Sequence, residues 1–182
     1  QETFSCLEKA RFPVLVACQG GSFGGAMGLL TAADMRYCTK DAFFIVQETN
    51  IGLPADIGTL QRIGKIIPEG IAKEWCLTGK KILAKEAYEA GFVNKVCSSL
   101  KELMATVNQY AELIVKNSPL AVCGTKKMIH YARDHNTHDS LDYMATWQSG
   151  MFTGNDIMES FMSHQKGISP NFQNLPSQFS WD

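Results

Sequence analysis

The sequence lacks any apolar run of the roughly 18 residues that a helix needs to cross a bilayer. No signal or transit peptide is visible near Gln1, and the last residues, QFSWD, do not form a peroxisomal tripeptide signal. We therefore expect no membrane partner, and the compartment stays undefined by the sequence.

An excess of charge of one sign is also lacking. Lysine and arginine number 17 and aspartate and glutamate 18, which gives a formal net charge of −1, and no block of like charges stands out. Nucleic-acid surfaces and polybasic membrane contacts need such an excess. We expect neither kind of partner.

Cysteine pairs with recognisable spacing are absent, although the chain holds six cysteines. Cys18 in VLVACQG and Cys76 in EWCLTG lie in apolar runs, where a free thiol acts as a small hydrophobe. A 182-residue chain with 45% hydrophobic residues can bury a core without disulfides, so we expect reduced thiols. His130, His135 and His138 lack the pattern of a known metal site, and we expect no metal.

Strand and helix patterns alternate in the first half of the chain. β-Branched or aromatic runs predict strands at 14–20, 34–38, 42–46 and 92–97, with a loop at 47–55. Helices are expected at 1–12, 26–33, 56–63, 68–77 and 85–90. Strand 14–20 is expected in a sheet covered on both faces, because its apolar run is continuous. This half indicates an α/β core.

After Leu100 the strand signals stop. Helices are expected at 100–117, 119–133, 138–151 and 155–164, followed by a tail rich in Pro, Asn, Gln and Ser. We therefore divide the chain into an α/β domain, 1–98, and a helical region, 99–182.

A glycine-rich turn precedes the small-residue helix expected at 26–33. Gly20, Gly21, Gly24 and Gly25 allow close backbone approach, and a helix that starts here adds the positive end of its dipole. Backbone N–H groups in such a turn can stabilise an oxyanion. A tight strand-to-helix turn needing glycine only for packing is the alternative.

Two acids lie in the segment that follows. Glu48 and Asp56 stand eight residues apart, and two carboxylates can move protons at opposite ends of a conjugated system. The alternatives are a solvated loop acid for Glu48 and a helix N-cap, worth about 1 kcal/mol, for Asp56.

Three ordered motifs resemble the crotonase (enoyl-CoA hydratase/isomerase) family. They are PVLVACQGGSFGGAMGLLTAADMRYC (Pro13–Cys38), AFFIVQETNIGLPADIGTLQRI (Ala42–Ile63) and LTGKKILAKEAYEAGFVNKV (Leu77–Val96). Asp56 within IGLPADIGTLQ makes the chain most similar to the Δ3,5-Δ2,4-dienoyl-CoA isomerases, since typical hydratases carry no acid there. The resemblance implies a crotonase (ClpP-like) spiral of ββα units followed by C-terminal helices that oligomerise.

The resemblance also implies roles for single residues. Gly25 would supply an oxyanion-hole N–H, Glu48 would serve C2 of a 3,5-dienoyl-CoA, and Asp56 would serve C6 as the 2,4-dienoyl-CoA forms. The pairing is firmer than the assignment of each acid to one carbon. Substrate contacts are implied for Gly24, Gly28, Leu53, Pro54 and Lys166. No cofactor is implied, because CoA arrives as part of the acyl-CoA thioester.

One position departs from the family pattern. Hydratases carry a second glutamate at the position of Gly28, and dienoyl isomerases usually carry an aspartate there. The glycine argues against hydration, because no second acid stands beside Glu48 to position a water. Activity as an enoyl-CoA hydratase or Δ3-Δ2-enoyl-CoA isomerase remains the alternative enzyme function.

The family domain also starts well upstream of Gln1, so we expect the N-terminal part of the fold, with a second oxyanion donor, to be absent from this chain. The family further implies a homotrimer or dimer of trimers and a mitochondrial or peroxisomal matrix. A non-catalytic, acyl-CoA-binding crotonase-like subunit is the other alternative.

Overall fold

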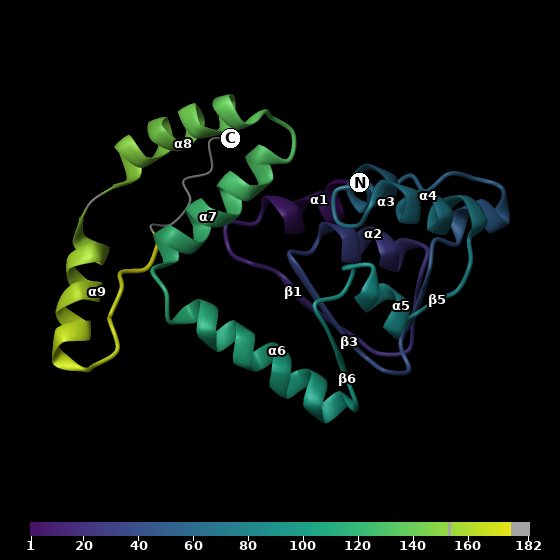
Figure 1. The fold of residues 1–182 in the computed structure, drawn as a ribbon, viewed down its shortest axis with the longest axis horizontal. Helices are drawn as coiled ribbons and strands as arrows, with labels where there is room; N and C mark the ends of the chain where they lie inside the picture. The colour runs from purple at the N-terminus through teal and green to yellow at the C-terminus, as the bar shows by residue number, and fades with distance from the viewer. Residues whose placement is uncertain (153, 176–182) are drawn as a thin grey trace. The chain divides into compact units, whose positions relative to one another are not determined.

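The computed structural model describes residues 1–152 and 154–175, and the chain divides into two compact units, Gln1–Ala111 and Glu112–Asp182 (Figure 1). The first unit is α/β, with two small sheets and the helices packed on them. The expected α/β fold is therefore confirmed. The strands end at Cys97 and helix α6, Leu100–Val115, follows, so the division between the units falls inside this helix.

The first sheet is parallel and has the order β1-β3-β6. Its strands are β1 (Leu15–Cys18), β3 (Met35–Thr39) and β6 (Lys95–Cys97). These match three of the predicted strands. The expectation of cover on both faces is wrong for β1 among the described residues, because the side chain of Ala17 is exposed.

The second sheet has the order β2-β4-β5. Strand β2 (Gly21–Phe23) is parallel to β4 (Phe43–Ile45), and β5 (Ile82–Leu83) is antiparallel to β4. The glycine segment expected to be only a turn thus contributes a strand. Strand β2 consists largely of Gly21 and Ser22 and β5 of only two residues, so neither has the β-branched or aromatic run that predicts β4 and β6.

Six short helices belong to this unit, and α2 packs against α1 and α3 (Figure 1). They are α1 (Glu2–Lys9), α2 (Gly25–Ala32), the 3-10 helix η1 (Glu48–Ile51), α3 (Thr59–Ile63), α4 (Glu69–Thr78) and α5 (Ala84–Glu89). The fully buried rings of Trp75, Phe44 and Phe92 centre the core, with Phe92 edge-on to the other two at 5.8 and 5.5 Å.

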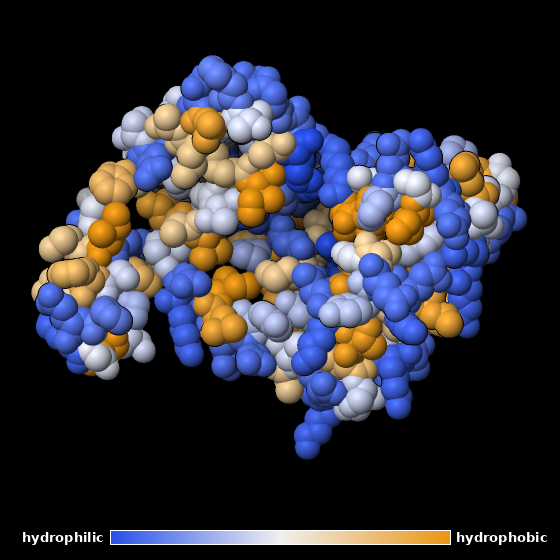
Figure 2. Space-filling model, in the orientation of Figure 1, coloured by the Kyte–Doolittle hydropathy of each residue, from blue (hydrophilic) through white to orange (hydrophobic). Residues whose placement is uncertain are grey.

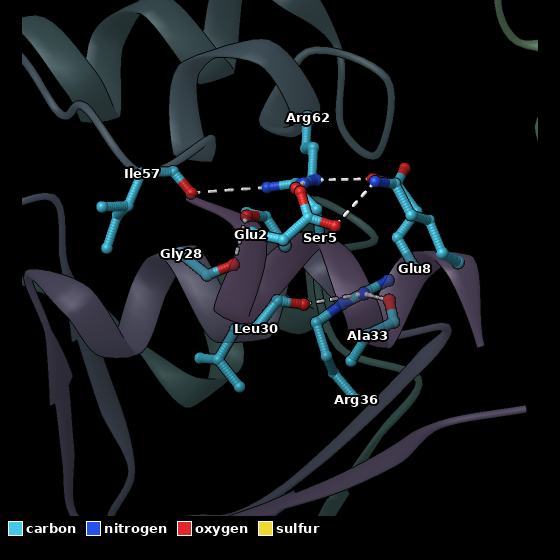
Figure 3. A network of polar contacts seen from close by, with 11 residues as sticks. Glu2, Ser5, Glu8, Gly28, Leu30, Ala33, Arg36, Ile57 and Arg62 are labelled. Atoms are coloured by element: carbon cyan, nitrogen blue, oxygen red, sulfur yellow. Dashed lines mark hydrogen bonds and ion pairs between the residues drawn. The ribbon is translucent and has the colours of Figure 1, made fainter. Parts of the chain in front are cut away.

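Arg36 of β3 is a buried cation that ties this core together. Its Nε donates to the carbonyl of Phe92 at 2.6 Å, and a terminal nitrogen donates to the carbonyls of Leu30 and Ala33 at 3.1 and 2.6 Å (Figure 3). Leu30 lies in the last turns of α2 and Ala33 is its C-cap. The guanidinium therefore fixes the C-terminal end of α2 to the central strand and to the segment before β6.

The described part of the second unit is helical. It contains α7 (Pro119–Ala132), α8 (Thr137–Met151) and α9 (Asn155–Lys166), as the sequence predicts. Ser118 caps α7 by accepting from the N–H of Ala121, and Asn136 caps α8 by accepting from the N–H of Asp139. These caps satisfy donors that a helix start leaves free.

Many large apolar side chains of the second unit are exposed, and apolar residues are visible at the surface in Figure 2. They include Leu141, Met151, Phe152, Ile157, Met158, Phe161 and Met162. Within the chain itself these residues are not core. No helix among residues 1–152 and 154–175 is both long and apolar enough to span a bilayer.

All six cysteines are free, and Cys18, Cys38, Cys76 and Cys97 are buried, which confirms the expected reduced core thiols. Burial raises the pKa of the Cys18 thiol to about 11 and that of Cys38 to about 12. The two residues are direct partners across β1 and β3.

These thiols predict a loss of stability at alkaline pH. The unfolded chain releases thiol protons above about pH 8.5, whereas the folded chain holds them until its raised pKa values. The contribution is complete below about pH 8.5 and is lost as the pH rises toward 11–12. Between pH 8.5 and about 11, the free energy of unfolding measured in urea should fall by about 2 kcal/mol more for wild type than for Cys38→Ala. Equal losses would contradict it.

Arg36→Met should cost about 3 kcal/mol of unfolding free energy, because three buried carbonyls lose their donor. Chemical denaturation measures the change. The exposed Lys85, paired with Glu89 at 3.7 Å, supplies the control, and Lys85→Met should stay within about 0.5 kcal/mol of wild type. Similar losses in both variants would show that Arg36 carries no special role.

Candidate active site

The turn from β2 into α2 presents a free backbone donor. Gly24 is the N-cap of α2 with φ 54° and ψ −123°, a conformation that L side chains rarely adopt, and Gly25 is the first helical residue. The N–H of Gly24 donates to the carbonyl of Ile45 at 3.3 Å, and Met27 donates to the carbonyl of Gly24 at 2.8 Å. No hydrogen bond of the described residues uses the N–H of Gly25, which is an exposed residue.

Glu48 is buried, with 7% of its surface exposed, and it opens η1. Its Oε2 has no hydrogen-bond partner among the described residues. The solvated loop acid considered as an alternative is therefore wrong for Glu48. The pKa of Cys76 is raised first by burial and then by the charge of Glu48, so the carboxylate faces this thiol.

Helix η1 is fixed to the C-terminal end of α4 by two side chains. Thr49 Oγ1 donates to the carbonyl of Cys76 at 2.7 Å, and Asn50 Nδ2 donates to the carbonyl of Gly79 at 2.8 Å. Both acceptors are among the last carbonyls of α4 and its C-cap, which have no partner inside the helix. The clamp holds the backbone on which Glu48 stands.

Asp56 lies in a different environment, because its side chain is exposed. It does not cap α3: the N-cap is Gly58, in the left-handed region at φ 101°, and no side-chain cap bond forms. The expected helix at 56–63 thus begins three residues later, at Thr59. The backbone carbonyl of Asp56 accepts from Nε2 of Gln1 at 2.8 Å.

The turn and the first acid are connected through β4. Gly24 is bonded to Ile45 of β4, and Glu48 follows three residues after Ile45. Leu53 and Pro54 are exposed between the two acids, and the N–H of Leu53 donates to the carbonyl of Glu48 at 3.2 Å.

The other two predicted contacts lie on helices α2 and α9. Gly28 is buried in α2, and Lys166 ends α9 in the second unit with an exposed side chain. Their roles in substrate binding stay predictions. Among residues 1–152 and 154–175 no group of three or more His, Cys, Asp or Glu side chains is arranged to hold a metal ion.

Several structural residues of this region carry no signal in the sequence. Arg62 of α3 donates to Glu8 Oε2 at 2.9 Å, to Ser5 Oγ at 3.0 Å and to the carbonyl of Ile57 at 3.4 Å (Figure 3). Its partners are more than fifty residues away, except Ile57, so no local pattern predicts them. The same holds for Thr49 and Asn50, whose partners lie on α4 and its C-cap.

The parallel sheet, the glycine-started helix α2 and the buried Glu48 after β4 agree with the expected crotonase fold. The chain belongs to the enoyl-CoA hydratase/isomerase family, whose model matches residues 1–175. The crystal structure of enoyl-CoA hydratase from Bacillus anthracis superposes with a TM-score of 0.89 at 29% identity, covering 94% of this chain and 66% of that one.

Curated relatives are more similar in sequence. The mitochondrial Delta(3,5)-Delta(2,4)-dienoyl-CoA isomerase of Rattus norvegicus is 43% identical over 161 residues, which are 88% of this chain and 49% of that protein. The peroxisomal Delta(3,5)-Delta(2,4)-dienoyl-CoA isomerase of Arabidopsis thaliana is 39% identical over 175 residues, covering 96% and 63%. The chain spans about half to two thirds of the length of these relatives.

Because Oε2 of Glu48 is buried without a hydrogen-bond partner, we expect Glu48 to lower the free energy of unfolding. Glu48→Leu, which keeps roughly the side-chain volume, should leave the free energy of unfolding unchanged or raise it by about 1 kcal/mol, because a buried polar atom without a partner is removed. Urea denaturation measures the difference.

Glu86 is the matched comparison, because its carboxylate accepts from Trp75 Nε1 at 3.1 Å and pairs with Lys80 at 2.8 Å. Glu86→Leu should cost about 1–2 kcal/mol. Destabilisation of both variants by the same amount would contradict the assignment of Glu48 as an unsatisfied group.

Proposed function

We propose that this chain is part of an isomerase that converts 3,5-dienoyl-CoA to 2,4-dienoyl-CoA. The observation that carries the proposal is the buried, unpartnered carboxylate oxygen of Glu48, on the segment that follows the strand bonded to the Gly24 turn. A buried acid without a hydrogen-bond partner lowers the stability of the fold, and a role in a reaction explains why it is present. The names of the rat and Arabidopsis relatives support the same substrate.

The proposed reaction moves two protons and no other atoms. The Glu48 carboxylate takes a proton from C2 of the thioester, and the N–H of Gly25 stabilises the negative charge that develops on the thioester oxygen. Asp56 relays a proton from solvent to C6. The C2–H electron pair becomes the C2=C3 bond, the C3=C4 pair moves to C4=C5, and the C5=C6 pair takes the new proton.

The environments of the two acids suit these roles. Glu48 is shielded from solvent, whereas Asp56 is exposed and can exchange protons with water between turnovers. Each cycle leaves the C2 proton on Glu48, which returns it to solvent before the next turnover, so the number of protons is unchanged. Because only protons move, we propose the reaction without a metal or redox cofactor, with CoA as part of the substrate.

Hydration is less compatible with the site. A hydratase holds water between two acids, and the family resemblance puts the second acid at position 28. Here Gly28 packs closely against Ile57, since a Cβ at Gly28 would lie only 2.8 Å from two of its carbon atoms. The space that a second carboxylate would fill is taken by an apolar side chain.

Further parts of the proposal follow from the family. We infer that Gly24, Leu53 and Pro54 contact the substrate directly, that the buried Gly28 contributes through the packing of Ile57 on it, and that Lys166 contacts a CoA phosphate of a neighbouring subunit. The exposed apolar residues of α8 and α9 support a homotrimer or dimer of trimers. The relatives' names support a mitochondrial or peroxisomal matrix location.

The test follows formation of the 2,4-dienoyl thioester by its ultraviolet absorbance, with residues 1–182 and the protein of the full reading frame assayed side by side. In the active protein, Glu48→Gln and Asp56→Asn should each lower kcat by about 100-fold or more, the scale of general acid–base catalysis. Glu89→Gln, at an exposed acid on α5, should leave kcat unchanged.

Deuterium exchange separates the two acids. In D2O, Asp56→Asn should still exchange the C2 hydrogens of substrate, and Glu48→Gln should not. The reverse pattern would exchange the roles of the acids. Full activity in both variants would overturn the two-carboxylate mechanism. A wild-type protein that binds acyl-CoA without isomerising it would identify a non-catalytic subunit, and rapid hydration of crotonyl-CoA would identify a hydratase.

A further inference from the structure

The side chain of Ile57 fills a notch in helix α2. A Cβ added at Gly28 would lie 2.8 Å from both Cγ1 and Cδ1 of Ile57 and 3.5 Å from Phe4 of α1. A Cβ at Gly25 would lie 3.7 Å from the same Cδ1. Residues three apart share one face of a helix, so the Ile57 side chain covers the face of the first turn of α2 that holds Gly25 and Gly28.

The backbone on either side of Ile57 is also fixed. The carbonyl of Asp56 accepts from Gln1 at 2.8 Å, and the carbonyl of Ile57 accepts from Arg62 at 3.4 Å. Arg62 is held in turn by Glu8 and Ser5 of α1 (Figure 3). The segment that carries Asp56 is therefore attached through both its main chain and the neighbouring side chain, while the Asp56 carboxyl itself is exposed.

The notch matters because α2 is held firmly at its other end. Arg36 bonds the carbonyls of Leu30 and Ala33, so α2 cannot easily shift to make room for a larger residue at position 28. Any added side chain there has to displace Ile57. Asp56 precedes Ile57 directly, and it would be displaced as well.

We propose that Ile57 is a positioning residue that seats in the Gly28 notch and thereby sets the Asp56 carboxyl relative to the N–H of Gly25. The proposal rests on the proposed isomerase function. It gives Gly28 a role of its own, because the absence of a side chain at Gly28 leaves the space that the Ile57 side chain fills. An aspartate at position 28 should therefore slow this protein, even though the resembling isomerases usually carry one.

The test uses Gly28→Ala, Gly28→Asp, Ile57→Ala and the double variant Gly28→Ala/Ile57→Ala in the active protein. Gly28→Ala and Gly28→Asp should lower kcat about 10- to 100-fold, the scale of a misplaced catalytic group, with KM changed less than about twofold. Exchange of the C2 hydrogens in D2O should continue at nearly the wild-type rate, because Glu48 and Gly25 remain in place.

The double variant tests the contact itself. Without the Ile57 side chain, the methyl group that Gly28→Ala introduces has space, so the double variant should be no slower than Ile57→Ala alone. Gly70→Ala on α4, where an added Cβ meets nothing within 4 Å, is the matched control and should behave as wild type. Losses that multiply in the double variant, or wild-type kcat in Gly28→Asp, would overturn the proposal.

Thermal melts of the same four variants separate this inference from the proposed function. Alanine normally stabilises a helix interior relative to glycine, so a lower melting temperature in Gly28→Ala that Ile57→Ala relieves would locate Ile57 in the notch even in a protein without isomerase activity. In that case the role in positioning Asp56 for catalysis falls with the activity. If Gly28→Ala does not fold, Ile57→Val, which removes only Cδ1, should lower kcat several-fold while C2 exchange persists, and an unchanged kcat would overturn the proposal.

Discussion

The buried guanidinium of Arg36 is the interaction on which the candidate site depends. It bonds carbonyls at the end of α2 and the carbonyl of Phe92, and so holds one helix and one loop on the central strand β3. A buried cation is tolerated only where its donors are satisfied, and these main-chain acceptors satisfy it. With the far end of α2 fixed in this way, the helix start at Gly25 has a defined place relative to β4 and Glu48.

The two acids illustrate how one segment can supply different chemical environments. Glu48 stands on a one-turn helix clamped to α4 and buried at 7% exposure, and Asp56 stands on a segment open to solvent. Folding alone would not favour a buried carboxylate oxygen without a partner. Glu48 lowers the stability of the fold, and the packing of the core rings Trp75, Phe44 and Phe92 offsets that cost.

Much of the fold could be predicted from the sequence, because most of its strands and helices lie in runs with clear hydrophobic patterns or caps. Strands β1, β3, β4 and β6 and helices α6–α9 were predicted for that reason. Strands β2 and β5 were missed because pairing with β4, and not their own residues, makes them strands. Aspartate is a residue type that N-caps prefer, but Gly58 in a left-handed conformation is the N-cap of α3 instead of Asp56.

The candidate site was predicted less completely, since its acids come from motifs while their supports come from contacts distant in sequence. Glu48 and Asp56 follow from the resemblance. Their supporting residues do not follow from it. The side chains of Arg62, Thr49 and Asn50 bond residues that are distant in sequence, and Ile57 packs on a separate helix. Sequence alone leaves these contacts among many equivalent possibilities.

The clamp between η1 and α4 has a consequence for how this protein can diverge. Its acceptors are main-chain carbonyls of Cys76 and Gly79, so a side chain on the outer face of α4 can change without altering the hydrogen bonds that hold η1. A one-residue insertion or deletion within α4 is different, because it rotates every following carbonyl by about 100°. Along this helix, evolution is free to replace amino acids but not to alter their number.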